Sequence, residues 1–292
     1  MSRIFLAGAT GVVGRRLLPR LVAAGHEVTA LTRRTADAEV LRSQGARAVV
    51  GDVFDADGLR DAVTTAAPEI VMHQLTDLAD LDFAANGRIR RVGTRNLVDA
   101  ALAAGTRRIV VQSIAWVYEP GDGPAGEETP LDLAAESESR RSMVDAVATM
   151  ERIAGELPEW VVLRYGALYG PGTWFAPGGL RTTQLHEGSL VSNADVSSFL
   201  HVEDAAASAV EALGWPTGVV NVVDDVPAAA SEWLPVFARA VGAAAPEVVQ
   251  TARSGWARGA DNTHARKDLG WTPVYGSWRD GFTQAAAGPG CA

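Results

Sequence analysis

The sequence predicts an α/β protein with a doubly wound parallel sheet and a small C-terminal lobe. Three observations support this prediction. A short apolar run leads into a glycine-rich turn and then a helical stretch, strand and helix signals alternate up to about residue 164, and beyond that point proline and glycine interrupt the pattern. Alternation of this kind buries a parallel sheet between layers of helices.

The first part of the chain has the order strand, turn, helix, strand. Residues 3–7 form an apolar run typical of a strand, and residues 8–14 read Gly-Ala-Thr-Gly-Val-Val-Gly. Residues 15–24 have helical spacing that Gly25 ends, and a second strand is expected over 27–31. In this context the glycine turn is typical of a Rossmann-type dinucleotide-binding fold.

The three glycines of the turn have separate tasks in such a fold. Gly8 permits the tight turn, Gly11 lets the backbone approach a pyrophosphate, and Gly14 allows the helix to pack closely on the strand. The helix N-terminus offers unpaired N–H groups and a positive dipole end to the phosphates. We therefore expect cofactor contacts from Gly8, Thr10, Gly11, Val12, Val13 and Gly14.

The end of the second strand predicts which cofactor binds. NAD-binding folds have an acidic residue there for the ribose 2′-hydroxyl, whereas this chain has Thr32 followed by Arg33 and Arg34. A guanidinium suits a 2′-phosphate, and no carboxylate at this position repels it. We expect NADPH to bind, and NADH to bind more weakly.

Further cofactor contacts are expected after the third and fourth strands. The third strand, 46–50, is followed by a turn from which Asp52 can accept a hydrogen bond from the adenine amino group, with Val53 beside it. The fourth strand is expected over 69–72, and Thr76, four residues beyond it, can reach the nicotinamide ribose.

The remaining elements complete the expected domain division. Helices are predicted over 56–66, 86–104 and 137–155, and strands over 108–112 and 160–164. Residues 1–165 would form the NADP-binding Rossmann domain. Residues 166–292 would mainly form a small substrate-binding lobe, with segments at about 199–225 returning to the Rossmann domain. Substrates of doubly wound folds lie beyond the carboxyl ends of the strands, so this lobe would cover the nicotinamide.

Composition agrees with a cytoplasmic enzyme that acts on a small molecule. A chain of 292 residues with 47% apolar content can bury a large core, and its net charge of −9 argues against nucleic acid or an anionic membrane as partner. Apolar runs are too short to span a bilayer. Cys291 is the single cysteine, and the five histidines are scattered, so neither a disulfide nor a metal site is expected.

Four sequence blocks, in addition to the glycine turn, carry a family resemblance. They are residues 92–97, 161–172, 199–206 and 268–273. With these blocks the chain resembles an extended short-chain dehydrogenase/reductase of the NAD-dependent epimerase/dehydratase superfamily. In that family a Ser or Thr, a Tyr and a Lys carry out the chemistry. The Tyr supplies a proton, and the Lys lowers the pKa of the Tyr and holds the nicotinamide ribose.

The resemblance breaks down at the catalytic Tyr and Lys. Tyr and Lys stand four residues apart in the family, with a Glu commonly four residues further on. Aligned on Glu151, the Lys position is Val147 and the Tyr position is Met143. No Tyr or Lys occurs between Tyr118 and Glu151, so a shift of register does not restore the pair.

Other residues are candidates for the catalytic site. Counting back from Tyr118 places the family's catalytic hydroxyl at Ile114, while a one-residue insertion at Trp116 would place it at Ser113. Because hydroxyls at strand ends usually bond to the backbone, a structural role for Ser113 is an alternative. Tyr165 and His186 are further candidate acids.

Aromatic residues in the C-terminal half are candidates for a substrate pocket. Most of them are expected in the core, but Trp174 and Phe175 stand between Gly172 and Pro177, on a loop expected near the substrate.

Three functions remain open at this stage. The first is an NADPH-dependent ketoreductase for a carbonyl of an aromatic polyketide or similar metabolite, in which substrate or solvent supplies the proton. Reductases of antibiotic biosynthesis of the simocyclinone ketoreductase type resemble this chain in having an intact glycine turn and no catalytic Tyr, and this resemblance implies a polycyclic aromatic ketone as substrate. The others are a non-catalytic NADP-binding sensor or regulator, and a nucleotide-sugar epimerase or dehydratase.

Overall fold

The chain divides into two compact units. The computed structural model describes residues 1–78 and 82–286. The first unit consists of Met1–Ser113, Leu133–Leu163 and Ala206–Val219. The second unit consists of Ile114–Asp132, Arg164–Ala205 and Val220–Ala292.

This division differs from the expected one in two places. Residues 114–132, expected in the Rossmann domain, belong to the second unit because they pack against its C-terminal segments. There Ala125 forms a bridge with Ala260, and the Tyr118 hydroxyl donates to the Asn221 side chain. The returning segment is 206–219, which is shorter than the expected 199–225.

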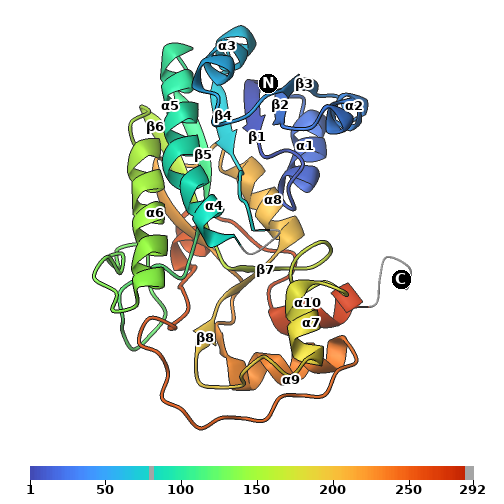
Figure 1. The fold of residues 1–292 in the computed structure, drawn as a ribbon, viewed down its shortest axis with the longest axis vertical. Coiled ribbons are helices and arrows are strands. Elements are labelled where there is room, and N and C mark those ends of the chain that lie inside the picture. The colour runs from blue at the N-terminus through green and yellow to red at the C-terminus, as the bar shows by residue number, and fades with distance from the viewer. Residues whose placement is uncertain (79–81, 287–292) are drawn as a thin grey trace. The chain divides into compact units, whose positions relative to one another are not determined.

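The main sheet has seven strands, of which the sequence predicted six (Figure 1). Its strand order is β10-β6-β5-β4-β1-β2-β3, and the pairs from β5 to β3 are parallel. The strands are β1 (Arg3–Ala7), β2 (Glu27–Thr32), β3 (Arg47–Val50), β4 (Ile70–His73), β5 (Arg108–Ile114), β6 (Glu159–Tyr165) and β10 (Gly218–Val222). Because β1 lies between β2 and β4, the strand order reverses at β1, where doubly wound folds bind their ligands.

Helices of the first unit follow the strands in alternation. They are α1 (Gly14–Ala23), α2 (Thr35–Ser43), α3 (Ala56–Ala66), α4 (Phe83–Arg88), α5 (Thr94–Ala103) and α6 (Glu138–Ala154). The predicted helix over 86–104 is interrupted by a π-helical turn, η1 (Ile89–Gly93). Asp55 caps α3 by accepting from the Gly58 N–H at 3.1 Å, which fits the preference for Asp at this position.

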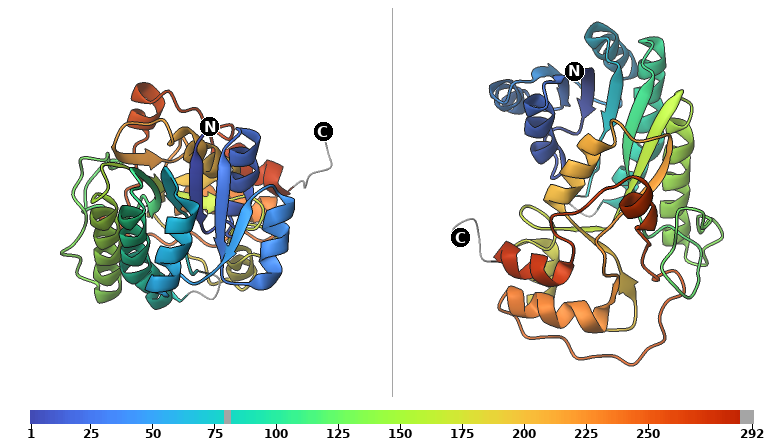
Figure 2. Two further views of the ribbon diagram at one scale, coloured as in Figure 1. Left: turned by 90° about the horizontal axis from the view of Figure 1, so that it is seen from above. Right: turned by 180° about the vertical axis from the view of Figure 1, so that it is seen from behind.

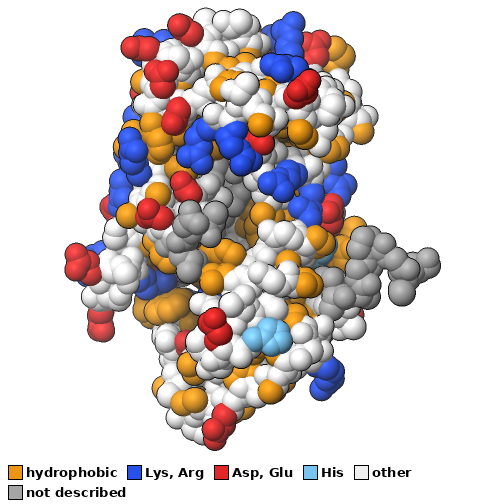
Figure 3. Space-filling model, turned by 45° about the vertical axis from the view of Figure 1, so that its right-hand side comes forward, with side chains coloured by type: hydrophobic (Ala, Val, Ile, Leu, Met, Phe, Trp, Pro, Cys, Tyr) orange, Lys and Arg blue, Asp and Glu red, His pale blue; other side chains and the backbone are white. Residues whose placement is uncertain are grey.

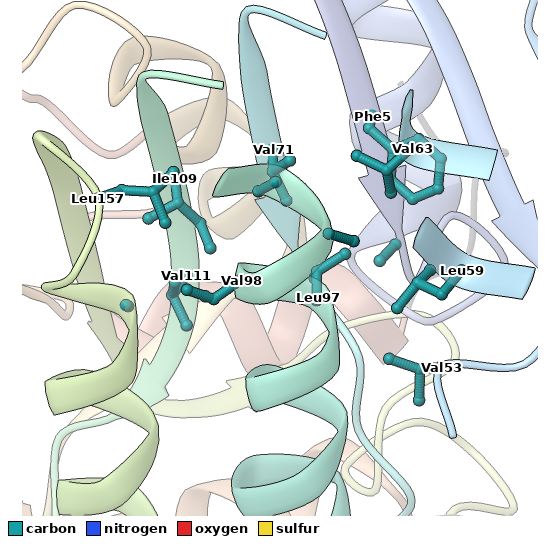
Figure 4. Close-up of a cluster of buried hydrophobic side chains, with 14 of the residues drawn as sticks. Phe5, Val53, Leu59, Val63, Val71, Leu97, Val98, Ile109, Val111 and Leu157 are labelled. Carbon is teal, nitrogen blue, oxygen red and sulfur yellow. The ribbon is translucent and has the colours of Figure 1, made fainter. Parts of the chain in front are cut away.

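The core of the first unit is mainly aliphatic (Figure 4). Side chains of α3, α5 and α6 pack on one face of β1, β4 and β5, and they include Leu59, Val63, Leu97, Val98, Met150 and Ile153. The strands supply Phe5, Val71, Ile109 and Val111 to the same cluster. Burial of these side chains fixes the carboxyl ends of β1 and β4 in register, with Ala7 opposite His73.

The second unit is built from shorter elements. These are β7 (Ala167–Tyr169), α7 (Leu180–His186), β8 (Val196–Ser197), β9 (Phe199–His201), β11 (Ala228–Ala229), α9 (Ala230–Ala240), η2 (His264–Asp268) and α10 (Trp278–Ala286). Helix α8 (Val202–Glu211) begins in the second unit and continues into the first. Strands β7 and β9 pair in parallel, β8 and β11 pair antiparallel, and α9 lies beside α10 (Figure 2).

Aromatic rings form the core of the second unit. Phe175 contacts Phe199, Trp233, Phe237 and Phe282, with ring centroids 5.3–5.9 Å apart. Trp278 donates its indole N–H to the Val226 carbonyl at 2.8 Å. No helix in the described part of the chain combines the length and hydropathy that a membrane span requires.

Candidate nucleotide and catalytic site

The glycine turn after β1 has space only for glycine at two positions. Gly8 has φ +99°, and a Cβ built on it would lie 2.5 Å from the backbone carbon of Gln74. A Cβ on Gly14 would lie 2.0 Å from the Gly8 carbonyl oxygen. Gly11 is exposed, and its N–H donates to the Gly8 carbonyl at 3.0 Å. The turn thus has the close backbone approach that a dinucleotide site needs.

The N-terminus of α1 suits a phosphate group. Its N-cap residue, Val13, makes no side-chain capping bond, and the first turn contains no acidic residue. Arg15 donates to the Thr10 carbonyl at 2.7 Å, and Arg16 donates to the Val12 carbonyl at 2.9 Å. Helix dipole and guanidinium groups therefore place positive charge beside the turn, and these residues fit the pyrophosphate of a nicotinamide dinucleotide.

The two arginines after β2 have different surroundings. Arg34 forms a two-pronged ion pair with Asp37, with distances of 2.7 and 3.0 Å. Arg33 is exposed, and it has no ion-pair partner in the described part of the chain. On the face drawn in Figure 3, basic side chains gather in the upper part of the molecule although the net charge is −9. Arg33 is therefore the arginine available to a 2′-phosphate.

The other residues expected to contact the cofactor, Asp52, Val53 and Thr76, differ in burial and in hydrogen bonding. One carboxylate oxygen of Asp52 accepts from the Phe54 N–H at 2.9 Å. The Val53 side chain is buried in the aliphatic core, so only its backbone is available to an adenine. Thr76 is exposed beyond the end of β4.

One face of α6 contains the positions at which the alignment on Glu151 predicts the family's Tyr and Lys. Met143, Val147 and Glu151 follow at intervals of four residues and so lie on the same helix face. Ser113, only 1% exposed, donates its hydroxyl hydrogen to the Glu151 carboxylate at 2.7 Å. Because this hydrogen is taken up by Glu151, Ser113 presents oxygen lone pairs to any other neighbour.

Two buried basic groups lie in the same unit. Burial lowers the pKa of Arg90 to about 10, and the Glu151 charge opposes this shift. Burial also lowers the pKa of His73 to about 4, with Arg90 acting in the same direction. His73 Nδ1 accepts from the Leu75 N–H at 3.3 Å, so its Nε2 donates to the Thr94 hydroxyl at 2.9 Å. The sequence interpretation missed Arg90, although an arginine at a core-facing position of a helix is a usable signal.

The candidate site residues of the second unit differ in burial and in hydrogen bonding. Tyr165 is buried, and its hydroxyl donates to the Ala205 carbonyl at 3.0 Å. His186 is exposed at the C-terminus of α7. Phe175 lies in the aromatic core, and Trp174 packs partly buried against that core. These positions give Tyr165 and Phe175 structural functions, and Trp174 retains the more accessible side chain.

Known proteins resemble the chain over most of its length. Residues 8–202 match a family described as NAD(P)H-binding. The chain belongs to this NAD(P)H-binding family. It is 43% identical to a Streptomyces 3-diazoavenalumate denitrifying reductase over 304 residues, which cover 96% of this chain and 99% of that protein. It is also 30% identical to a Mycolicibacterium smegmatis UDP-glucose 4-epimerase, covering 93% of each chain.

A solved structure shares the fold. The Bordetella bronchiseptica enzyme WbmG, in complex with NAD and UDP, has a TM-score of 0.79 at 24% identity, covering 98% of this chain and 94% of that one. The family match, the reductase relative and the shared fold agree with the glycine turn described above. The protein is an NAD(P)H-dependent oxidoreductase of the short-chain dehydrogenase/reductase type, and the non-catalytic sensor is set aside.

Proposed function

We propose that this protein is a reductase whose acceptor takes up a hydride without a proton from the protein, and that this acceptor is a diazo group on an aromatic carboxylate. The observation that carries the proposal is the α6 face with its neighbour Ser113. Met143 and Val147 have no proton to donate, and Ser113 gives its hydrogen to Glu151. Val147 and Ser113 are buried and Met143 is partly accessible, so none of the three supplies a proton to an incoming group.

Reduction of a diazo group suits a site without a proton donor, because the reaction consumes a hydride and no proton. When bound, the reduced nicotinamide supplies a hydride. The hydride pair forms a C–H bond at the ring carbon of an aryl diazonium ion, the C–N bond breaks, and its electron pair leaves with N2. The ring carbon is reduced and the nicotinamide is oxidised. If a neighbouring ring hydroxyl is ionised, solvent supplies the proton to that oxygen.

The Streptomyces relative supports this choice of acceptor. Its name describes the denitrifying reduction of a diazo carboxylate, and the similarity extends over nearly the whole of both chains. The residues of this chain would contribute binding and orientation. The glycine turn and the α1 N-terminus bind the dinucleotide, and holding two reactants in line supplies much of a rate enhancement without acid catalysis.

An aromatic ketone with a phenol beside its carbonyl is the second candidate acceptor. It corresponds to the expected reduction of a polycyclic polyketide, and the same lack of a protein acid supports it. Hydride addition develops negative charge on the oxygen, and the neighbouring phenol can donate a hydrogen bond to it. An epimerase or dehydratase fits the site less well, because its proton abstraction requires a base that Met143 and Val147 do not provide.

An isotope experiment tests the proposal. The protein is incubated with NADPH deuterated at one of the two C4 positions and with diazotised 3-amino-4-hydroxybenzoate, in which the diazo nitrogen is 15N-labelled. We expect labelled N2 and deuterium on the ring carbon from only one of the two C4 positions. Free NADPH reacting without the protein would transfer deuterium from both positions. Absence of stereospecific transfer would overturn the proposal.

Restoring the family's acid separates the two acceptors. In the double variant Met143→Tyr, Val147→Lys, reduction of an ortho-hydroxyaryl ketone should rise by about 10-fold or more, because a general acid is worth roughly 10²–10⁴-fold when well placed. Reduction of the diazo compound should not rise. An equal gain for both acceptors would show that protonation also limits the diazo reaction.

A further inference from the structure

Gln74 is a buried amide without a hydrogen-bond partner. The residue is 4% exposed, and within the described part of the chain neither its side-chain nitrogen nor its side-chain oxygen has a partner. Burying an amide without hydrogen bonds costs stability, and such groups in native proteins call for an explanation. A ligand that supplies both an acceptor and a donor would remove this cost.

The backbone holds Gln74 beside the glycine turn. Gln74 follows the last residue of β4, and its N–H donates to the Ala7 carbonyl at 2.8 Å. Its carbonyl group is one of the atoms that leave no space for a Cβ on Gly8. The preceding residue, His73, points toward Thr94 of α5, so the alternation of side chains along a strand directs Gln74 to the opposite face.

The strand order indicates which part of the cofactor passes this position. The dinucleotide binds where the strand order reverses, between β1 and β4. Its adenosine half runs toward β2 and β3, where Arg33 and Asp52 lie, so its other half runs over the end of β4. Phosphate oxygens only accept hydrogen bonds and would satisfy only the nitrogen of Gln74. A ribose hydroxyl both donates and accepts, so it can satisfy either atom.

We propose that the Gln74 side chain hydrogen-bonds the nicotinamide-side ribose of the bound cofactor. The Lys that holds this ribose in the family is replaced by Val147, which cannot form such a bond. Gln74 then takes over a positioning task that the α6 helix has lost. The inference rests on the nicotinamide cofactor, and it is independent of the acceptor.

The experiment compares Gln74→Met with the unchanged protein, since Met has a similar length and no amide. Without cofactor, the variant should unfold at a higher temperature, because an unpaired buried amide is removed. Its affinity for NADPH and for 2′-phospho-ADP-ribose should fall about 10-fold or more in a fluorescence or calorimetric titration. Its affinity for 2′-phospho-ADP, which lacks the second ribose, should stay the same.

The variant Gln250→Met is the matched control, since it makes the same substitution at an exposed glutamine of the second unit. It should change neither the melting temperature nor the affinities of the three probes. A lower melting temperature of Gln74→Met without cofactor, or an equal loss of affinity for all three probes, would overturn the inference. Because no acceptor is added, failure of the diazo reaction would leave this result interpretable.

Discussion

The two units bury different kinds of side chain. The first unit packs aliphatic residues of α3, α5 and α6 on a parallel sheet, whereas the second unit packs Phe and Trp rings that come from distant parts of the chain. In the first unit, the buried amide of Gln74 has no hydrogen-bond partner among the described residues, and the buried Ser113 bonds to Glu151. In the second unit, the Tyr165 hydroxyl donates a hydrogen bond to the Ala205 carbonyl. The comparison teaches that the first unit is organised for binding, and that the aromatic side chains of the second serve packing first.

Removing a ring from the second unit should have the largest effect. Phe175→Ala should lower the free energy of unfolding by about 4 kcal/mol, because the lost ring contacts four others. Hydrogen exchange, followed by mass spectrometry, should show the loss in second-unit peptides. Leu97→Ala is the matching variant of the first unit, and its loss of protection should appear in first-unit peptides. If Phe175→Leu instead raised the KM of the acceptor at unchanged stability, Phe175 would be the substrate contact that the sequence predicted.

A methyl group in the glycine turn should affect the first unit almost as strongly. Gly14→Ala places a Cβ against the Gly8 carbonyl, so we expect a loss of about 3 kcal/mol and no measurable NADPH binding in a fluorescence titration. Gly126→Ala, where a Cβ meets nothing within 4 Å, is the control. Normal NADPH binding by Gly14→Ala would mean that the turn adopts another conformation with cofactor.

The units should respond to pH in opposite directions. The pKa of His73 is lowered to about 4, so the unfolded state binds more protons between pH 4 and 6.5, and stability rises with pH there. Burial raises the pKa of Asp224 to about 7, so the folded state binds more protons between pH 4 and 7, and stability falls with rising pH. Each slope is at most about 1.4 kcal/mol per pH unit.

Two variants reveal these slopes in denaturation curves measured from pH 4 to 8. In Asp224→Asn, the free energy of unfolding should only rise with pH, because His73 is unchanged. In His73→Gln, it should only fall with rising pH, because Asp224 is unchanged. Asp225 lies beside Asp224 and raises the same pKa, so Asp225→Asn should reduce the fall slightly. If the free energy of unfolding changed with pH in the same way in these variants and in the unchanged protein, the two units would not respond to pH in opposite directions.

The smallest expected effect concerns the choice of cofactor. Arg33→Ala should reduce the preference for NADPH over NADH by about 10-fold, or about 1.4 kcal/mol, because its guanidinium is available to the 2′-phosphate. Arg34→Ala should reduce it less, because Arg34 is held by Asp37. Titrations with both cofactors provide the measurement. Equal affinities of the unchanged protein for NADPH and NADH would contradict the sequence prediction of an NADP enzyme.

Much of the first unit was predictable from sequence because its signals are local. A strand followed by Gly8, Gly11 and Gly14 and then a helix specifies the turn, and the α/β alternation specifies the sheet. The π-helical turn η1 was not predictable, because its residues continue the helical pattern on both sides. The sequence predicts the family's Tyr and Lys positions at Met143 and Val147, but it did not predict the bond between Ser113 and Glu151, which joins residues 38 positions apart.

The second unit was less predictable because its contacts are distant in sequence. Phe175 and Trp174 are adjacent in a loop rich in glycine and proline, which is typical of a binding segment. The partners that bury Phe175 come from β9, α9 and α10, and no local pattern connects these elements. For the same reason the sequence did not assign residues 114–132 to this unit.

The path of the chain also has a consequence for synthesis on the ribosome. The sheet acquires its last strand, β10, only when Gly218–Val222 has emerged, long after its neighbour β6 at Glu159–Tyr165. Until then β6, with the fully buried Val161, Val162 and Leu163, forms an unpaired sheet edge, which is a site of aggregation. At about 5–20 residues per second, this edge stays open for several seconds. During that interval the edge of β6 can pair with a strand of another chain.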